Sequence, residues 1–265
     1  FLPRTSPEEC LLDNVAAHAL HALGTRVPLP RSFHQVAKAN GVSLPQGVLA
    51  GLTADLNLIA SAPHLLPRWL RMPEGHRVVG PVYARLPGET PELLADLAAG
   101  PQPLVYFAMG SSGNRDLVLD VLAGLGQADC QVLAPVRSHL HEEDLETLPL
   151  NVHVTDWIPA HQLGDAVDLA ITHGGEGTVQ TSCVQGWPFI GIPLQFEQRF
   201  NIQRCVAFGS AKLVSQKEAR RTDWAALVRQ ALADDGMRSR ARRMARLMEG
   251  LDGPGRAAEA ICELL

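Results

Sequence analysis

Apolar residues between positions 103 and 214 form short runs, and the segments between them carry apolar residues at helical spacing. Such runs predict strands at 103–109, 130–135, 151–155, 168–172, 188–192 and 211–214. The intervening segments predict helices at 114–125, 160–166, 175–185 and 197–208. Short apolar strands that alternate with helices indicate a doubly wound parallel α/β sheet, a Rossmann-like arrangement. Ligands of such sheets bind at the carboxyl ends of the strands.

The first 90 residues follow a less regular pattern. Ser6-Pro7-Glu8-Glu9 has the form of a capping box and predicts a helix that ends near Leu23. Shorter elements are expected at 32–40 as a helix and at 55–60 and 77–79 as strands. Five prolines make the remainder of this region irregular.

This contrast predicts two domains. Residues 1–85 are interpreted as the remnant of an N-terminal domain with a linker, and residues 86–265 as a C-terminal domain that is wholly helical after Thr222. The chain begins at Phe1, as a processed or truncated product would.

Composition narrows the class of protein. The chain has 265 residues and a net charge of −5, so it has no general basic field for nucleic acid. The basic segment 238–246 is interleaved with apolar residues at helical spacing, which favours an amphipathic helix with a solvated cationic face over a membrane or nucleic-acid patch. Five cysteines stand singly, which indicates reduced, buried thiols in a cytoplasmic protein. We expect no transmembrane segment.

The segment His173-Gly174-Gly175-Glu176-Gly177-Thr178 is the most informative motif. It joins a predicted strand to a predicted helix, so the glycine-rich turn lies at a helix N-terminus. Free backbone N–H groups and the helix dipole favour a phosphate there. His173 adds a donor for a diphosphate oxygen and Thr178 adds a hydroxyl.

Other candidate groups lie near the ends of neighbouring strands. Trp157, followed by Ile158, offers an aromatic face to a base. Glu197-Gln198 sets a carboxylate beside an amide, a pair suited to sugar hydroxyls. The loop Gly110-Ser111-Ser112 is expected to approach the phosphates from a second side. These parts together suit a nucleotide sugar.

At these positions the chain resembles the UDP-glycosyltransferase-like family, glycosyltransferase family 1, which has the GT-B fold. The resemblance covers the last two-thirds of the chain well and the first third loosely. It is carried by Val79-Gly80-Pro81, Met109-Gly110-Ser111-Ser112-Gly113, Trp157-Ile158-Pro159, Thr172-His173-Gly174-Gly175, Gly177-Thr178, Gly186-Trp187-Pro188 and Glu197-Gln198.

The resemblance implies a glycosyltransferase that moves a hexose from a nucleotide-diphosphate sugar to a hydroxyl of a small molecule or lipid. It implies inversion at the anomeric carbon, without a metal or other cofactor. The donor-binding residues it implies are Gly110, Ser111, Ser112, Trp157, Ile158, His173, Gly174, Gly175, Gly177, Thr178, Glu197 and Gln198.

Two departures from the family pattern leave parts of this interpretation open. Ala160 and Thr181 stand where many members carry a glutamine and a glutamate for the ribose, so UDP, TDP and GDP donors all stay open. The acceptor pocket and the histidine base belong to the family's N-terminal domain, most of which would precede Phe1. We therefore assign no catalytic base, and we expect residues 1–265 alone to bind a nucleotide sugar without transferring it.

Two alternative functions remain. The chain could be a non-catalytic nucleotide-sugar-binding subunit that needs a partner chain, or a nucleotide-sugar epimerase or hydrolase.

The histidines outside these motifs are not interpreted as ligands or catalysts. The segment His139-Leu140-His141-Glu142-Glu143 has two imidazoles and two carboxylates, but no distant third ligand is indicated for a metal. It is interpreted as an exposed polar loop. His34, His64 and His161 are interpreted as structural or exposed.

Overall fold

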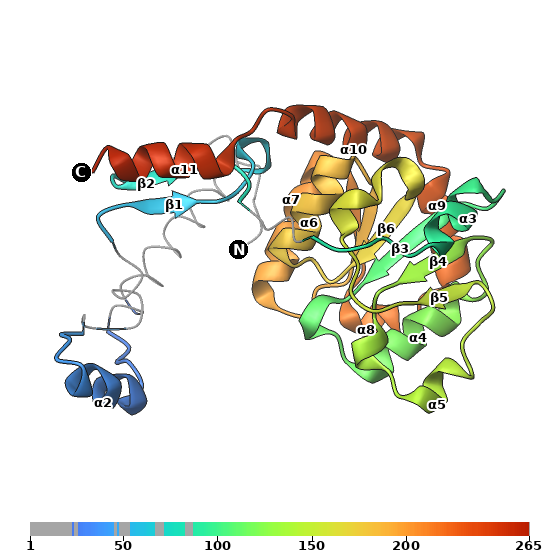
Figure 1. The fold of residues 1–265 in the computed structure, drawn as a ribbon, viewed down its shortest axis with the longest axis horizontal. Coiled ribbons are helices and arrows are strands. Elements are labelled where there is room, and N and C mark those ends of the chain that lie inside the picture. Colours follow the sequence, from blue (N-terminus) through green and yellow to red (C-terminus); the bar gives the residue numbers. More distant parts are fainter. Residues whose placement is uncertain are drawn as a thin grey trace. The chain divides into compact units, whose positions relative to one another are not determined.

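The chain divides into two compact units. The computed structural model describes residues 23, 26–44, 47, 54–66, 72–82 and 87–264 (Figure 1). One unit consists of residues 81–251 and the other of residues 1–80 with 252–265. The predicted domains 1–85 and 86–265 stay a prediction, and the predicted helix from Ser6 to Leu23 falls almost wholly outside the described residues.

The larger unit is built on one sheet of six parallel strands. Their spatial order is β5-β4-β3-β6-β7-β8, so the chain winds outward first on one side of β3 and then on the other side of β6. This is the doubly wound topology that the alternation of strands and helices predicted, and that prediction is confirmed. The strands are β3 (Leu104–Ala108), β4 (Gln131–Ala134), β5 (Val152–Val154), β6 (Leu169–Thr172), β7 (Phe189–Gly191) and β8 (Ala211–Leu213).

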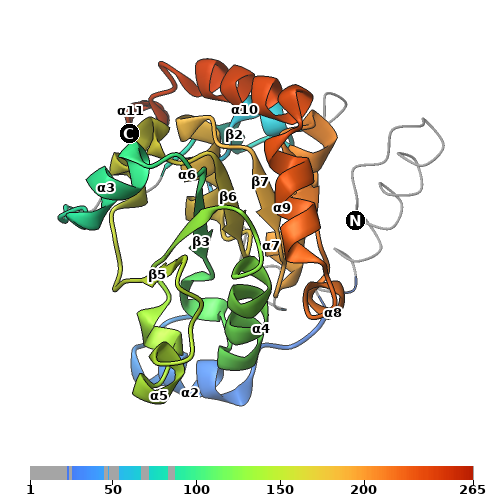
Figure 2. The same cartoon turned by 90° about the vertical axis from the view of Figure 1, so that its right-hand side faces the viewer.

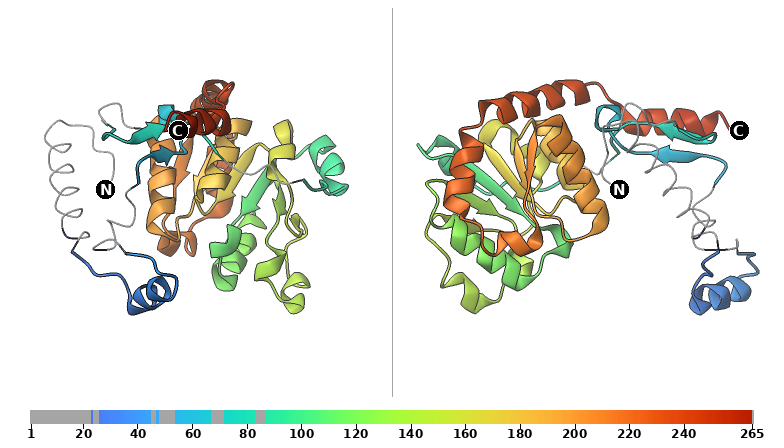
Figure 3. Two further views of the ribbon diagram at one scale, coloured as in Figure 1. Left: turned by 60° about the vertical axis from the view of Figure 1, so that its left-hand side comes forward. Right: turned by 180° about the vertical axis from the view of Figure 1, so that it is seen from behind.

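Helices cover both faces of this sheet (Figures 2 and 3). Helices α4, α8 and α9 pack together on one face, α6 and α7 lie on the other, and α10 contacts both α6 and α9. The helices are α3 (Leu93–Ala99), α4 (Arg115–Leu125), α5 (Glu142–Leu145), α6 (Glu176–Gln185), α7 (Phe196–Phe208), α8 (Gln216–Ala219), α9 (Trp224–Leu232) and α10 (Asp235–Met248).

Strand β3 shows why the sequences of the strands are continuous apolar runs. Val105 and Phe107 point into the core shared with α4 and α9, whereas Leu104 and Tyr106 point to the opposite face. All five side chains of β3 are buried because helices cover both sides. Each large apolar side chain removed from water in this way stabilises the fold by about 1.5–3 kcal/mol.

Local sequence signals set the helix ends. The Asn114 side chain accepts a hydrogen bond from the Leu117 N–H (3.0 Å) and so caps α4. Gly186 ends α6 at φ +73° and Gly209 ends α7 at φ +88°, a backbone region that glycine enters without strain. These caps explain why the predicted bounds of these three helices are correct to within a residue.

The helix predicted over 160–166 is wrong. Two 3-10 turns occupy the segment, Ala160–Gln162 and Gly164–Ala166. Gly164 adopts φ +53° between them, which interrupts a continuous helix. Three short helices, α3, α5 and α8, were not predicted. For α8 a signal was present, because Ser215 and Glu218 form a capping box.

The C-terminal part of the larger unit confirms the amphipathic helix. In α10 the buried side chains are Met237, Ala241, Met244 and Met248, and the cationic positions Arg240, Arg242, Arg243 and Arg246 are exposed.

The prediction of buried thiols is confirmed for Cys130, Cys183 and Cys205, whereas Cys262 is exposed. In the described part of the chain, no helix has the length and apolar character needed to cross a membrane.

The smaller unit holds a two-stranded parallel sheet. Strand β1 (Asn57–Ile59) pairs with β2 (His76–Val78), close to the predicted strands. Arg77 of β2 forms an ion pair with Glu263, just after α11 (Gly253–Cys262). The predicted helix at 32–40 is confirmed as α2 (Arg31–Ala39), followed by Gly41 at φ +63°.

Candidate donor-binding site

Two of the motif segments, the loop after β3 and the turn after β6, lie where the strand order of the large sheet reverses. Strands β3 and β6 are neighbours, with Ala108 opposite Thr172, but their chains continue to opposite sides of the sheet. The loop Gly110–Ser112 and the turn after Thr172 therefore diverge from a common point at the carboxyl edge. This is the position where doubly wound sheets bind ligands.

The His173 ring is enclosed by two glycines of this edge. A Cβ atom on Gly110 would lie 2.5 Å from His173 Cε1, and one on Gly175 would lie 2.4 Å from His173 Nε2. Neither position has room for a side chain while the ring stays in place. His173 as a whole residue is only 7% exposed. Glycine at these two positions is thus required for the imidazole to lie between the two loops.

The surroundings of His173 disfavour the charged imidazolium. Burial lowers its pKa from the ordinary value, the nearby Ala108 carbonyl opposes that change, and the charge of the nearby His139 lowers the pKa further. Its Nδ1 atom is buried and has no hydrogen-bond partner in the described part of the chain. An unpartnered buried nitrogen at a strand end is unfavourable unless a ligand or water satisfies it.

The N-terminus of α6 lies directly after this ring. Gly175 is the N-cap, and because glycine has no side chain it gives no side-chain cap to the first backbone N–H groups of the helix. Gly174 adopts φ +87° and turns the chain from β6 into α6. Space is open beside Gly177, where a Cβ would meet no atom within 4 Å. The uncapped amides of Glu176, Gly177 and Thr178 can therefore receive an anion.

Glu197 and Gln198 differ sharply in their surroundings. Gln198 is 2% exposed, and its Oε1 accepts hydrogen bonds from the N–H groups of Leu194 (2.9 Å) and Gln195 (3.1 Å). Its Nε2 donates to Ser112 Oγ at 3.2 Å, which joins the start of α7 to the loop after β3. In this structure its side chain is therefore engaged by the protein itself.

The Glu197 carboxylate is exposed and remains accessible. It accepts one long hydrogen bond from Asn201 Nδ2 (3.4 Å), and that amide also donates to the Gly174 carbonyl at 3.1 Å. Partial burial and the charge of Glu176 raise the pKa of Glu197. Glu197 and Asn201 thus lie one helical turn apart, next to the glycine turn.

The two tryptophans of the motif region have different roles. Trp157 is 59% exposed and its ring edge lies close to Gly88, where a Cβ would come within 2.9 Å of Cζ3. The following residue, Ile158, is buried. Trp187, in contrast, is buried and its Nε1 donates to the Gly164 carbonyl at 2.8 Å. Trp157 is therefore the one available for stacking on a planar ligand.

His139 contacts the loop after β3, which the sequence interpretation did not predict. It was assigned to an exposed polar loop, and that assignment is wrong for its ring, which is half-buried and lies 2.7 Å from the Gly110 carbonyl oxygen. His139 follows β4, and β4 is the neighbour of β3 in the sheet. The loops that follow two adjacent parallel strands meet at the same edge, which is the signal that could have identified it.

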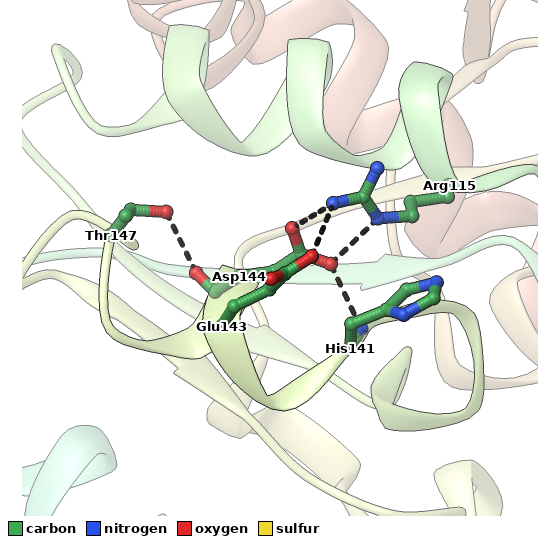
Figure 4. Close-up of polar contacts among 5 residues, drawn as sticks. All are labelled: Arg115, His141, Glu143, Asp144 and Thr147. Atoms are coloured by element: carbon green, nitrogen blue, oxygen red, sulfur yellow. Dashed lines mark hydrogen bonds and ion pairs between the residues drawn. The ribbon is translucent and has the colours of Figure 1, made fainter.

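The segment after His139 is fixed to α4 by a bidentate ion pair (Figure 4). Arg115 donates from Nε to Asp144 Oδ2 at 2.8 Å and from Nη2 to Oδ1 at 2.5 Å. Asp144 Oδ2 also accepts from the His141 backbone N–H at 2.8 Å. The Glu143 carboxylate lies farther from Arg115, at 3.7 Å. Asp144 thus joins three separate donors.

We expect Asp144→Asn to lower the free energy of unfolding at pH 7. In acid, the difference between the Asp144→Asn protein and the unsubstituted chain should disappear. The hydrogen bonds from Arg115 hold the pKa of the Asp144 carboxyl below its ordinary value. A lowered folded-state pKa gives stability that is complete above the unfolded pKa of about 3.9 and is lost as the pH falls through the folded value. The free energy of unfolding in urea, measured at pH 7 and near pH 3, checks this.

Glu143→Gln is the matched control for this prediction, because Glu143 is exposed and only distantly paired. It should change the free energy of unfolding little at either pH. An Asp144→Asn protein as stable as the unsubstituted chain at pH 7 would contradict the anchoring role of this carboxylate.

Comparisons with known proteins agree with this geometry. Residues 119–264 match the family described as "Erythromycin biosynthesis protein CIII-like, C-terminal domain". A "PGL/p-HBAD biosynthesis glycosyltransferase" of Mycobacterium tuberculosis (strain ATCC 25177 / H37Ra) is 29% identical over 191 residues, which are 72% of this chain and 44% of that protein.

Solved structures show the same fold. The glycosyltransferase of kitacinnamycin superposes with a TM-score of 0.69 at 22% identity, over 89% of this chain and 61% of the other. Glycosyltransferase VinC, in complex with DTDP, superposes with a TM-score of 0.65 at 18% identity, over 84% and 55%. The predicted GT-B type fold is confirmed. The chain spans about half of the length of these relatives.

Proposed function

Since this chain belongs to the erythromycin biosynthesis protein CIII-like C-terminal domain family, we propose that it carries the donor site of a glycosyltransferase. The reaction moves a hexose from a nucleotide-diphosphate sugar to a hydroxyl of a small molecule or lipid. The acceptor pocket and the base that deprotonates the hydroxyl belong to another domain or a partner chain.

The observation that carries this proposal is the buried His173 ring, whose Nδ1 has no hydrogen-bond partner in the described part of the chain, beside the uncapped N-terminus of α6. A diphosphate placed there would accept hydrogen bonds from the amides of residues 176–178 and from the imidazole. The helix dipole would favour its negative charge. The DTDP bound to glycosyltransferase VinC is a molecule of this chemical kind.

The remaining candidate residues fit the other parts of such a donor. Trp157 offers its exposed ring to the base, with Ile158 behind it in the core. Ser111 and Ser112 approach the phosphates from the second loop. The accessible Glu197 suits the sugar hydroxyls, and Gln198 would have to exchange its present partners to join it.

In the proposed reaction this chain stabilises the leaving group, the nucleoside diphosphate. The acceptor oxygen forms a bond to the anomeric carbon while the bond from that carbon to the diphosphate oxygen breaks. Both electrons of the broken bond stay on the diphosphate, and the hydroxyl proton passes to the base. Donors already aimed at the diphosphate stabilise the charge that develops there. The nucleotide sugar is itself the activated reactant, so the proposal includes no further cofactor.

Titration calorimetry with UDP, TDP and GDP, and then with their sugars, tests the proposal. We expect saturable binding of at least one diphosphate by residues 1–265, and weaker binding of the corresponding nucleoside, which lacks the charge that the α6 amides and His173 would hold. A folded sample that binds none of the three diphosphates would overturn the assignment of the donor site.

We also propose a cytoplasmic location for this site. Cys183 and Cys205 face each other with their Sγ atoms 3.8 Å apart, and both are free thiols. The hydrogen bond with Cys205, together with burial, raises the pKa of Cys183 and favours its protonated form. Free thiols in such proximity fit a reducing compartment.

A further inference from the structure

The imidazole of His139 holds the loop that follows β3. His139 ends the 3-10 turn Arg137–His139, and its Nε2 lies 2.7 Å from the carbonyl oxygen of Gly110. A carbonyl oxygen only accepts hydrogen bonds, so Nε2 carries a proton and donates it to this bond. The histidine after β4 thus fixes the direction of one peptide group after β3.

Gly113 makes room for this ring. A Cβ atom on Gly113 would lie 3.1 Å from His139 Nε2 and 2.8 Å from the Cβ of Met109. Because the second distance is shorter than real Cβ contacts, a side chain at this position would displace the loop. Gly113 therefore lies in close contact with both Met109 and the imidazole of His139.

Gly110 is held between two imidazoles. On one side its carbonyl accepts the hydrogen bond from His139, and on the other side its Cα faces the ring of His173. It adopts φ +53°, in the left-handed region. The orientation of the Gly110–Ser111 peptide is consequently determined from both sides.

The orientation of this peptide decides where the Ser111 amide points. In a trans peptide the N–H group points away from the preceding carbonyl. With the Gly110 carbonyl directed at His139, the Ser111 N–H is directed away from His139. Outside its own 3-10 turn, Gly110–Ser112, no backbone acceptor for this N–H is found in the described part of the chain, and Ser111 is exposed, so a ligand can reach the N–H.

We propose that His139 is a positioning residue of the donor site, which aims the Ser111 amide at the diphosphate of the donor. It touches the peptide that binds the ligand and does not touch the ligand itself. This inference rests on the proposed function, because it assumes that a diphosphate binds between the loop after β3 and the N-terminus of α6.

The segment that carries His139 is rigid enough for this role. The Arg137 N–H donates to the Thr155 carbonyl at 3.2 Å, and the His139 N–H donates to the Val136 carbonyl at 2.9 Å. Beyond it, Asp144 ties the segment to Arg115 of α4 (Figure 4). A side chain that sets the geometry of a binding loop must itself be held in place, and these bonds hold it.

The experiment compares His139→Ala with His139→Gln in residues 1–265. The probe is UDP or TDP, whichever the unsubstituted chain binds more tightly. Binding of the corresponding nucleoside, which lacks the diphosphate, is measured by NMR titration for comparison. We expect His139→Ala to weaken diphosphate binding about tenfold, the effect of losing a bond worth about 1.4 kcal/mol, and to leave nucleoside binding unchanged. A glutamine N–H reaches toward the same carbonyl, so His139→Gln should recover most of the affinity.

His153→Ala is the matched control, because the His153 ring bonds the Gln131 side chain at 2.8 Å and is remote from Gly110 in the strand register. It should bind the diphosphate as the unsubstituted chain does. The inference is overturned if His139→Ala retains full diphosphate affinity, or if it loses diphosphate and nucleoside binding equally without rescue by glutamine. An unsubstituted chain that binds no diphosphate overturns the proposed function, and the role of His139 with it.

Discussion

Gly174→Ala is expected to destabilise the larger unit by about 3 kcal/mol. Gly174 adopts φ +87°, where an L-residue with a Cβ costs about 1–2 kcal/mol. The added Cβ would also lie 2.5 Å from Cδ1 of Ile202 and 2.8 Å from the backbone carbonyl of Gln198. Ile202 is fully buried and cannot move aside, so this overlap costs about another 1–3 kcal/mol.

Urea unfolding measures this effect, and Gly177→Ala is its matched control. Gly177 lies three residues further along, inside α6, with open space around it. Replacing a helical glycine with alanine stabilises a helix by about 0.5–1 kcal/mol, so this control should be neutral or slightly more stable. If both substitutions lower the urea midpoint equally, the close approach of α7 to the glycine turn is not what requires glycine at 174.

His173→Ala is expected to weaken the binding of a nucleoside diphosphate by about a hundredfold. A hydrogen bond to a charged group contributes up to about 3 kcal/mol, and a hundredfold change corresponds to about 2.7 kcal/mol. Calorimetric titration with UDP and TDP measures the loss. The His153→Ala variant, which also loses one imidazole hydrogen bond, should bind normally. Undiminished binding by His173→Ala would contradict a role for this ring in holding the diphosphate.

The protonation of His173 supplies a second measurement of the same prediction. Because burial lowers its pKa, its contribution to stability is complete above the unfolded pKa of about 6.5 and is lost as the pH falls through the lower folded value. A bound dianion favours the imidazolium and raises that pKa. The melting temperature between pH 7.5 and 5.5 should therefore fall less with diphosphate than without it. This difference should vanish in His173→Ala, whereas His153, whose pKa burial also lowers, affects both conditions alike.

The proposed anion-binding turn, residues 172–178, could be predicted from the sequence because it is a local structure. Residues 172–178 form one continuous strand–turn–helix segment, so the glycines, the imidazole and the helix N-terminus are adjacent along the chain. The same holds for the six strands, since apolar runs of this length are buried wherever helices alternate with them. The sequence alone was a poorer guide over 160–166, where a glycine with positive φ replaces a helix with two short turns.

The roles of His139 and Gln198, which contact the loop after β3, depend on which strands lie side by side. His139 was read as part of an exposed loop because nothing in residues 139–143 shows that β4 pairs with β3. Gln198 was predicted to bind sugar hydroxyls together with Glu197, yet in the folded chain it is buried and its side chain donates to Ser112. Both assignments require contacts between residues far apart in the chain, 29 positions for His139 and Gly110 and 86 for Gln198 and Ser112.

The parallel α/β sheet and the glycine turn with its helix N-terminus follow from the sequence, because periodicity and glycine placement act over a few residues. Three features follow only from the folded chain: two glycines enclose the His173 ring, His139 bonds the Gly110 carbonyl, and Gln198 is buried while Glu197 is exposed. The order of strands across the sheet determines which loops meet, and that order is set by the packing of the whole core.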